Sequence, residues 1–180
     1  MEKLVVNIEN IEEYDTKMEK ARAIIVNEDN QIYICNMNDS FILPGGTVEK
    51  GEQPITTLLR ELKEELGLEK IAPMEWLTVS YYHNGFPKYK QEGFERRLNV
   101  VYYYLLTIHS NDIKDSTFTE YEIEHNEKIE KYSFSELWDL MKMPSSNQWK
   151  KFTDLELKFI LERYNKQFDV LKEREAHVRK

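Results

Sequence analysis

One stretch of the chain, residues 44–68, constrains the fold more than any other, because a glycine-rich loop leads there into a short helix with clear ends (PGGTVEKGEQPITTLLRELKEELGL). Pro54 suits the first position of a helix, and Gly67 suits the left-handed residue just past its end. At about 100° per residue, five apolar side chains of this helix share one arc. They are Ile55, Leu58, Leu59, Leu62 and Leu66. The stretch therefore predicts a helix over 54–66 that packs against a core.

The other face of this predicted helix carries three carboxylates within two turns, those of Glu61, Glu64 and Glu65. Like charges at this spacing repel by about 0.2–0.5 kcal/mol per pair. Arg60, four residues before Glu64, offsets part of that repulsion. Clustered carboxylate oxygens suit Mg²⁺ or Mn²⁺, and a solvated acidic face is the plainer alternative.

The spacing of the stretch decides between these two interpretations. Gly46, five residues, Glu52, seven residues and then REUxEExGU from Arg60 to Leu68 match all nine specified positions of the Nudix box, where U is a bulky aliphatic residue. The chain therefore resembles the Nudix hydrolase (MutT-like) family. The resemblance extends from about Arg22 to Leu140, through ARAIIV, LPGG and EKIEKYSFSEL, although Lys131 stands where many members have tryptophan.

The resemblance implies a mixed-sheet α/β/α sandwich that cleaves a phosphoanhydride of a nucleotide derivative with Mg²⁺, or with Mn²⁺. Its metal ligands would be Glu61, Glu64, Glu65 and the carbonyl oxygen of Gly45. Glu52 and Arg60 would support those ligands, and Gly46 would let the loop bend. Catalysis is expected to involve Glu64 and Arg60, with the general base either a box glutamate or one of four glutamates on a later loop. Those four are Glu120, Glu122, Glu124 and Glu127, and the match of the following strand favours Glu127.

Substrate recognition is expected from Arg22 on the first main strand and from the aromatic and basic residues of residues 81–97, among them Tyr82 and Arg97. Aromatic faces can stack on a base while cations bind phosphates. The alternative is that these aromatic residues pack in the core or along an edge strand, and that the charges only solubilise the chain.

The rest of the chain predicts strands and helices mixed along the sequence. A hairpin is expected over 21–36, strands over 76–82 and 98–108 joined by a long loop over 83–97, and a strand over 128–134 followed by a short helix that Ser133 and Glu136 cap. A last helix is expected to start at a Thr153–Glu156 capping box. Residues 1–145 would form the hydrolase domain, with its core at about 21–142.

Residues 146–180 would form a helical extension that packs either on its own domain or against a dimer partner. The apolar stripe behind that expectation is short, about three heptads. It consists of Leu157, Leu161, Tyr164, Phe168, Leu171 and Val178. A homodimer is therefore one of two alternatives that the sequence leaves open.

Composition limits the remaining classes of function. The 180 residues suit one compact domain, and the net charge of −8 with scattered basic residues argues against a stable nucleic-acid partner. The single cysteine, Cys35, excludes an intrachain disulfide and is expected to act as a small core residue. No 18 apolar residues follow one another, so neither a membrane span nor a signal peptide is expected and the location would be cytoplasmic.

The sequence therefore predicts a pyrophosphatase for a nucleoside diphosphate linked to another group, such as ADP-ribose or a nucleotide sugar. Two rival enzymes are a pyrophosphohydrolase of oxidised deoxynucleoside triphosphates and an enzyme that removes a 5′ pyrophosphate from RNA. The rival from another class is a Nudix-derived module that binds its ligand without cleaving it. The intact box argues against that module, since mutually repelling carboxylates serve nothing without chemistry.

Overall fold

The computed structural model describes residues 2–3, 14–37, 39–87, 92–114, 128–143 and 148–178. Eight strands form one mixed sheet in the order β1-β6-β7-β2-β3-β4, with β5 paired to β2 and β8 paired to β3. The strands are β1 (Glu2–Lys3), β2 (Thr16–Val26), β3 (Gln31–Met37), β4 (Ser40–Ile42), β5 (Gly45–Thr47), β6 (Met74–Pro87), β7 (Phe94–Thr107) and β8 (Lys128–Ser133). The helices are α1 (Pro54–Leu66), the 3₁₀ turn η1 (Ser110–Asp112), α3 (Phe134–Met141) and α4 (Gln148–Val178).

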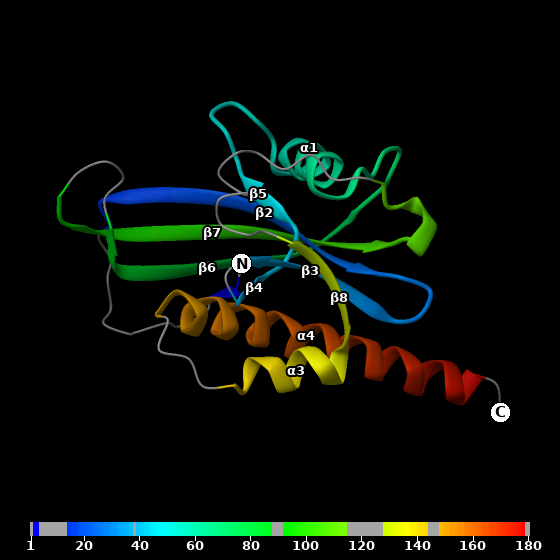
Figure 1. Ribbon diagram of the computed structural model, residues 1–180. Helices are drawn as coiled ribbons and strands as arrows, with labels where there is room; N and C mark the ends of the chain where they lie inside the picture. Colours follow the sequence, from blue (N-terminus) through cyan, green and yellow to red (C-terminus); the bar gives the residue numbers. More distant parts are fainter. Residues whose placement is uncertain are drawn as a thin grey trace.

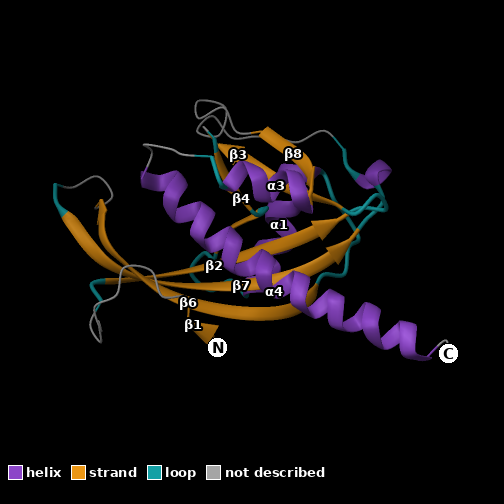
Figure 2. Ribbon diagram, turned by 90° about the horizontal axis from the view of Figure 1, so that it is seen from below, coloured by secondary structure: helices purple, strands orange, loops and turns teal. Residues whose placement is uncertain are grey.

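Helices cover both faces of this sheet, with α1 on one side and α3 and α4 on the other (Figure 1). The predicted α/β/α sandwich is therefore confirmed. Strands β7 and β2 lie side by side in parallel, whereas β2 pairs antiparallel with both β3 and β5. Seen from below, α4 crosses the sheet, and its C-terminal end extends beyond it (Figure 2).

Strand β2 serves both cores because its side chains alternate between the two faces of the sheet. Ala21, Ala23 and Ile25 pack with the apolar side chains of α1, whereas Ile24 belongs to the cluster under α3 and α4. The small side chains of Ala21 and Ala23, both fully buried, let α1 approach the strand closely. Strand β2 therefore contributes side chains to the core on both faces of the sheet.

Helix α1 has the bounds expected from the sequence. Pro54 occupies its first turn, and Gly67 ends it in a left-handed conformation with φ at 63°. The Gly67 N–H donates to the Lys63 carbonyl, as in the αL type of helix cap, and the Leu68 N–H donates to the Leu62 carbonyl. The predicted cap of α3 is confirmed as well, since Ser133 and Glu136 form a reciprocal capping box.

Two expectations about the second half of the chain were wrong. Most of the loop expected over 83–97 is strand, because β6 continues to Pro87 and β7 begins at Phe94. Helix α4 begins at Gln148, so Thr153 caps nothing, and its hydroxyl donates to the Lys150 carbonyl inside the first turns.

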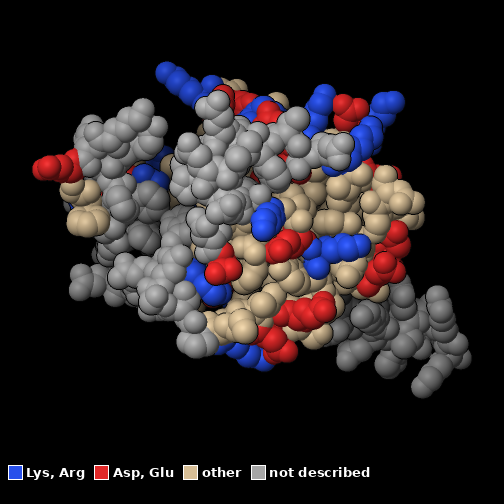
Figure 3. Space-filling model, in the orientation of Figure 1, with Lys and Arg blue, Asp and Glu red and all other residues tan. Residues whose placement is uncertain are grey.

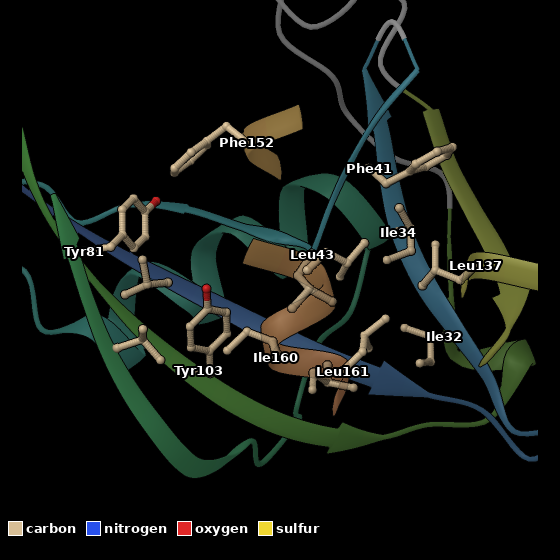
Figure 4. Packing of buried hydrophobic residues seen from close by; sticks show 14 residues of the cluster. Ile32, Ile34, Phe41, Leu43, Tyr81, Tyr103, Leu137, Phe152, Ile160 and Leu161 are labelled. Carbon is tan, nitrogen blue, oxygen red and sulfur yellow. The ribbon is translucent and has the colours of Figure 1, made fainter. Parts of the chain in front are cut away.

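The first half of α4 packs on its own domain. Leu157, Ile160 and Leu161 are buried in the same cluster as residues of the sheet. Figure 4 shows Ile160 and Phe152 of α4 beside Tyr81 of β6 and Tyr103 of β7. One of the two expected modes of packing is therefore present, while the boundary at residue 145 and the homodimer stay predictions.

Charged side chains of both signs are mixed on the surface, in keeping with the scattered basic residues of the sequence. On the face in Figure 3, lysine and arginine side chains are interspersed with aspartate and glutamate. Within the described part of the chain, no helix combines the length and the apolar character needed to cross a bilayer. The cytoplasmic location stays a prediction.

Candidate functional site

The three carboxylates of α1 occupy different environments. The side chain of Glu64 is 47% exposed and that of Glu61 16%, whereas the whole of Glu65 is only 6% exposed. The sequence placed all three on the free face of the helix, which is wrong for Glu65. The buried arc is rotated from the expected one, since Thr57 is fully buried and Leu59 is 38% exposed.

Glu65 is buried because protein donors bind both of its oxygens. The Gly45 N–H donates to Oε2 at 2.9 Å, and the Cys35 thiol donates to Oε1 at 3.6 Å. Cys35 lies on β3, where it shares the α1-facing side of the strand with Tyr33. A buried carboxylate needs such donors to offset its lost hydration. The sequence predicts Cys35 only as a small core residue, so its contact with Glu65 was not expected.

Two glycines let the chain pass between β2 and these carboxylates. Gly45 has φ at 125°, and a Cβ added there would lie 2.2 Å from the Ala21 carbonyl oxygen. A Cβ added to Gly46 would lie 2.1 Å from Glu61 Oε1. A larger residue at either position would force the backbone away. Glu61, Glu65 and the peptide units of the two glycines therefore converge at one point.

Arg60 joins the loop to the carboxylates of the helix. Its guanidinium donates to Glu61 Oε1 at 2.9 Å, to Glu64 Oε2 at 3.3 Å and, through Nε, to Glu52 Oε1 at 3.4 Å. The Thr57 hydroxyl donates to Glu52 as well, at 2.6 Å. Loop and helix are thus held in one arrangement through charge-assisted hydrogen bonds.

The pKa values of this network follow from the same contacts. Hydrogen bonds from Thr57 and then Arg60 lower the pKa of Glu52. Burial acts to lower the pKa of Arg60, but the hydrogen bond to Glu52 and the charge of Glu61 outweigh it and raise that pKa. Glu52 is therefore ionised and Arg60 protonated throughout the physiological pH range.

Arg22 lies next to the same glycines on the other side of β2. Its Nη1 donates to the Leu43 carbonyl and, at 3.4 Å, to the Gly45 carbonyl. The expected metal ligand, the Gly45 carbonyl oxygen, and the expected phosphate ligand, Arg22, are therefore in contact. A carbonyl oxygen has two lone pairs and can serve a second partner.

The other predicted substrate residues have different surroundings. Arg97 is 8% exposed, and its guanidinium binds Glu95 and the Met18 sulfur. Tyr82 follows the buried Tyr81 on β6, but its side chain lies outside the described residues. Glu120, Glu122, Glu124 and Glu127 lie outside them too. Substrate binding by Arg97 and Tyr82, and general-base catalysis by Glu127, stay predictions.

The groups that could bind a metal where Glu61, Glu65 and Gly45 converge are oxygen atoms, which suit a hard divalent cation. Glu61, Glu65 and the Gly45 carbonyl would hold Mg²⁺ or Mn²⁺, with Glu64 at the exposed rim. Within the described ranges, no three acidic, histidine or cysteine side chains lie close enough together to make a ready metal site. Arg60 draws Glu61 and Glu64 toward itself while Glu65 is bound beneath Gly45. A metal would therefore compete with Arg60 for two of the carboxylates.

Comparison with known proteins places this site in a family context. The family profile described as NUDIX domain matches residues 16–154. The chain is 36% identical over 66 residues to m7GpppN-mRNA hydrolase NUDT17 of Xenopus laevis, which covers 37% of this chain and 22% of that protein. It is 40% identical over 58 residues to 8-oxo-dGTP diphosphatase of Escherichia coli (strain K12), 29% of this chain and 45% of that protein.

A third relative, the RNA pyrophosphohydrolase of a Nitratiruptor species, is 45% identical over 47 residues, 24% of this chain and 30% of that protein. The chain thus spans less than half the length of these curated relatives. Among solved structures, MutT from Bacillus halodurans has a TM-score of 0.49 at 18% identity, covering 76% of this chain and 79% of that one. A MutT structure from a study of the Aliivibrio salmonicida and Vibrio cholerae proteins has a TM-score of 0.46 at 18% identity, covering 78% and 98%.

Proposed function

The chain belongs to the NUDIX domain family, and from that premise we propose that it is a metal-dependent pyrophosphohydrolase. Its substrate would be a nucleotide or a nucleoside diphosphate derivative, and the bond cleaved would be a phosphoanhydride. A nucleoside diphosphate linked to another group, such as ADP-ribose or a nucleotide sugar, is the substrate class that we favour. Mg²⁺ is the proposed metal, and Mn²⁺ has the same preference for oxygen ligands.

The observation that carries this proposal is the convergence of Glu61 and Glu65 on the Gly45–Gly46 segment. Both carboxylates approach one stretch of backbone, and an added Cβ at either glycine would collide with its surroundings. A divalent metal held by these groups supplies neutralisation of phosphate charge and a bound water of lowered pKa. This geometry supports the proposed anhydride hydrolysis.

The residues of the chain would then share the work by position. Arg60 fixes Glu61 and Glu64 relative to Glu52, so the carboxylates keep one geometry. Arg22, at the Gly45 carbonyl, presents a guanidinium where the substrate phosphates would lie. Glu64, the most exposed box carboxylate, or Glu127 would accept the proton of the attacking water.

A substrate panel tests this function directly. Nucleotide or phosphate release would be measured from ADP-ribose, a nucleotide sugar, a dinucleoside polyphosphate, 8-oxo-dGTP and RNA with a 5′ triphosphate, each with Mg²⁺, with Mn²⁺ and with a chelator. Metal-dependent release from at least one substrate is expected. Absence of release from all of them, together with a ligand that raises the melting temperature, would replace the enzyme by a binding module.

The panel also separates the candidate substrate classes. The names of the matched relatives refer to capped mRNA, 8-oxo-dGTP and RNA. The panel therefore includes substrates of these chemical types as well as those of the favoured class. Fastest turnover of ADP-ribose or the nucleotide sugar would support the favoured class. Fastest turnover of 8-oxo-dGTP or of the RNA would reassign the substrate and leave the chemistry intact.

A further inference from the structure

Three cationic side chains share the face of the sheet that lies under α4. Lys20 and Arg22 are on β2 at alternate positions with Ile24, whose side chain packs in the core on this face. Arg97 of β7 pairs in register with Thr16, which puts it on the same face farther along the sheet. Lys20 and Arg22 are neighbours on one strand, and the parallel pairing of β2 and β7 brings the distant Arg97 to the same face.

Among the described residues, two carboxylates offset part of this charge. Glu95 binds the Arg97 guanidinium and also accepts a hydrogen bond from Thr16 at 2.9 Å. Glu156 reaches the face from α4, and its two oxygens accept hydrogen bonds from the hydroxyls of Tyr81 and Tyr103. Three cations against two carboxylates leave these five charged groups with one positive charge in excess.

Lys20 is the cation that this arrangement leaves without a direct partner. Its side chain is partly buried, and it forms neither a hydrogen bond nor an ion pair with any described residue. Burial, and then the charge of Arg22, lower the pKa of its amine to about 8, against the opposing effect of Glu156. A partly buried ammonium without a direct partner among the described residues is costly, but with a pKa of about 8 it stays mostly protonated at neutral pH.

The neighbouring Arg22 connects this face to the candidate metal site. Lys20 stands opposite Thr47 in the β2–β5 pairing, while Arg22 stands opposite Gly45 and donates to its carbonyl oxygen. Lys20 and Arg22 are two residues apart on one strand, so their Cα atoms are about 7 Å apart. One extended ligand can therefore reach the Gly45 carbonyl region with one group and Lys20 with another.

We propose that Lys20, assisted by Arg22, binds an anionic group, a phosphate or a carboxylate, that the substrate carries outside its metal-bound diphosphate. The proposal rests on the function proposed above and narrows its substrate class. A bound anion would supply the negative charge that balances these five groups. It would also give the Lys20 ammonium a direct partner, which no described residue provides. The preferred substrates would thus be diphosphate derivatives with a further acidic group on the sugar or the leaving group.

Matched pairs of substrates that differ by one acidic group test this proposal. NADH and NADPH differ by a ribose phosphate, dephospho-coenzyme A and coenzyme A by another, and UDP-glucose and UDP-glucuronate by a carboxylate. The ratio of kcat/KM for the charged over the uncharged member would be measured for each pair. The phosphate pairs and the carboxylate pair distinguish the two sources of the anion.

The wild-type protein is expected to prefer the charged member of at least one pair. Lys20→Met should reduce that ratio about tenfold, the equivalent of one hydrogen bond between charged groups. Lys17→Met removes a lysine from the same strand, and should keep the wild-type ratio because Lys17 is exposed and paired with Glu19. Glu156→Gln keeps an acceptor for a tyrosine hydroxyl, removes the opposing charge and should raise the ratio.

Equal ratios in wild type and Lys20→Met for every pair would overturn the proposal, as would a wild-type preference for the uncharged member throughout. A binding measurement separates this failure from failure of the proposed function. Without metal, calorimetry would compare adenosine 2′,5′-bisphosphate with AMP. Tighter binding of the bisphosphate by wild type that Lys20→Met abolishes would support the anion site even in a protein without turnover. Equal binding here, together with equal ratios in every substrate pair, would refute it.

Discussion

The two faces of the sheet carry opposite charge arrangements. On the α1 face, each carboxylate of the box meets protein donors, from Arg60, Gly45 and Cys35. On the α4 face, Lys20, Arg22 and Arg97 lie with the carboxylates of Glu95 and Glu156, and Lys20 has no direct partner among the described residues. An acidic site satisfied by the protein therefore lies across β2 from a basic site in which Lys20 has no direct partner among the described residues. Under the two proposals above, one face would prepare the chemistry and the other would select the ligand.

The largest effect is expected from breaking the acidic face at its buried carboxylate. Glu65→Gln should lower kcat/KM about a thousandfold, comparable with the loss of a major transition-state-stabilising group. The new amide keeps an oxygen for the Gly45 N–H, so the free energy of unfolding without metal should change by only about 1 kcal/mol. Steady-state kinetics and urea unfolding measure the two quantities. Turnover within tenfold of wild type would refute a role for this carboxylate.

A smaller loss is expected from the residue that organises the same face. Arg60→Ala frees Glu52, Glu61 and Glu64 from their common partner, and should cost about 10- to 100-fold in kcat/KM. Arg60→Lys should keep only part of the wild-type kcat/KM, because an ammonium cannot reproduce the planar, forked hydrogen bonding of the guanidinium. Lys63→Ala, a change at an exposed position of the same helix, is the control. Identical kinetics for Arg60→Ala and this control would contradict the organising role.

Cys35 offers a finer test of how the acidic face is held. Cys35→Val removes the donor to Glu65 and should raise the metal concentration for half-maximal activity about fivefold, as expected for one hydrogen bond of about 1 kcal/mol. Cys35→Ser keeps a donor and should stay near the wild-type value. A metal titration of both variants checks this. Equal shifts in the two variants would mean that packing, rather than the hydrogen bond, is what matters.

The smallest effect concerns the basic face and appears as a pH dependence of stability. The pKa of Lys20 is about 8 in the folded chain, against an ordinary value of 10.5. Between these values the unfolded chain binds a proton that the folded chain lacks, so this group makes the free energy of unfolding rise with pH. Glu156, Arg22 and Arg97 are the charged groups that act on Lys20.

Urea unfolding of wild type and Lys20→Met at pH 7.5, 8.5 and 9.5 isolates this contribution, because the tyrosines titrate alike in both proteins. The wild type should gain stability relative to the variant as the pH rises. A difference that stays constant with pH would show that the lysine has an ordinary pKa.

The acidic face was largely predictable from the sequence because its parts are close in the chain. Glu52, Arg60 and Glu61 lie within ten residues, and the bounds of α1 follow from Pro54 and Gly67. The contact between Cys35 and Glu65 was not predictable, since it depends on how β3 is placed relative to α1. The same contact explains why the sequence wrongly put Glu65 on the exposed face.

The basic face could not be predicted, because residues 20, 97 and 156 meet only through the strand order and the path of α4. The local pattern of Thr153–Glu156 is typical of a helix cap. Glu156 instead accepts hydrogen bonds from the hydroxyls of two tyrosines that are distant in the sequence. The polar stretch 83–97 resembled a loop by composition, yet Arg97 and Glu95 are buried as an ion pair within a strand. Local patterns fail where a charged residue has its partner on another element.

The most direct test of the acidic face is metal binding in the absence of any substrate. Calorimetric titration of Mn²⁺ would compare wild type with Glu65→Gln and with Glu69→Gln, a change to an exposed carboxylate paired with Lys63 just beyond the same helix. Wild type and Glu69→Gln should bind with equal affinity, and Glu65→Gln at least about tenfold more weakly. Equal affinity in all three proteins would contradict the assignment of the metal site to the convergence of Glu61, Glu65 and Gly45.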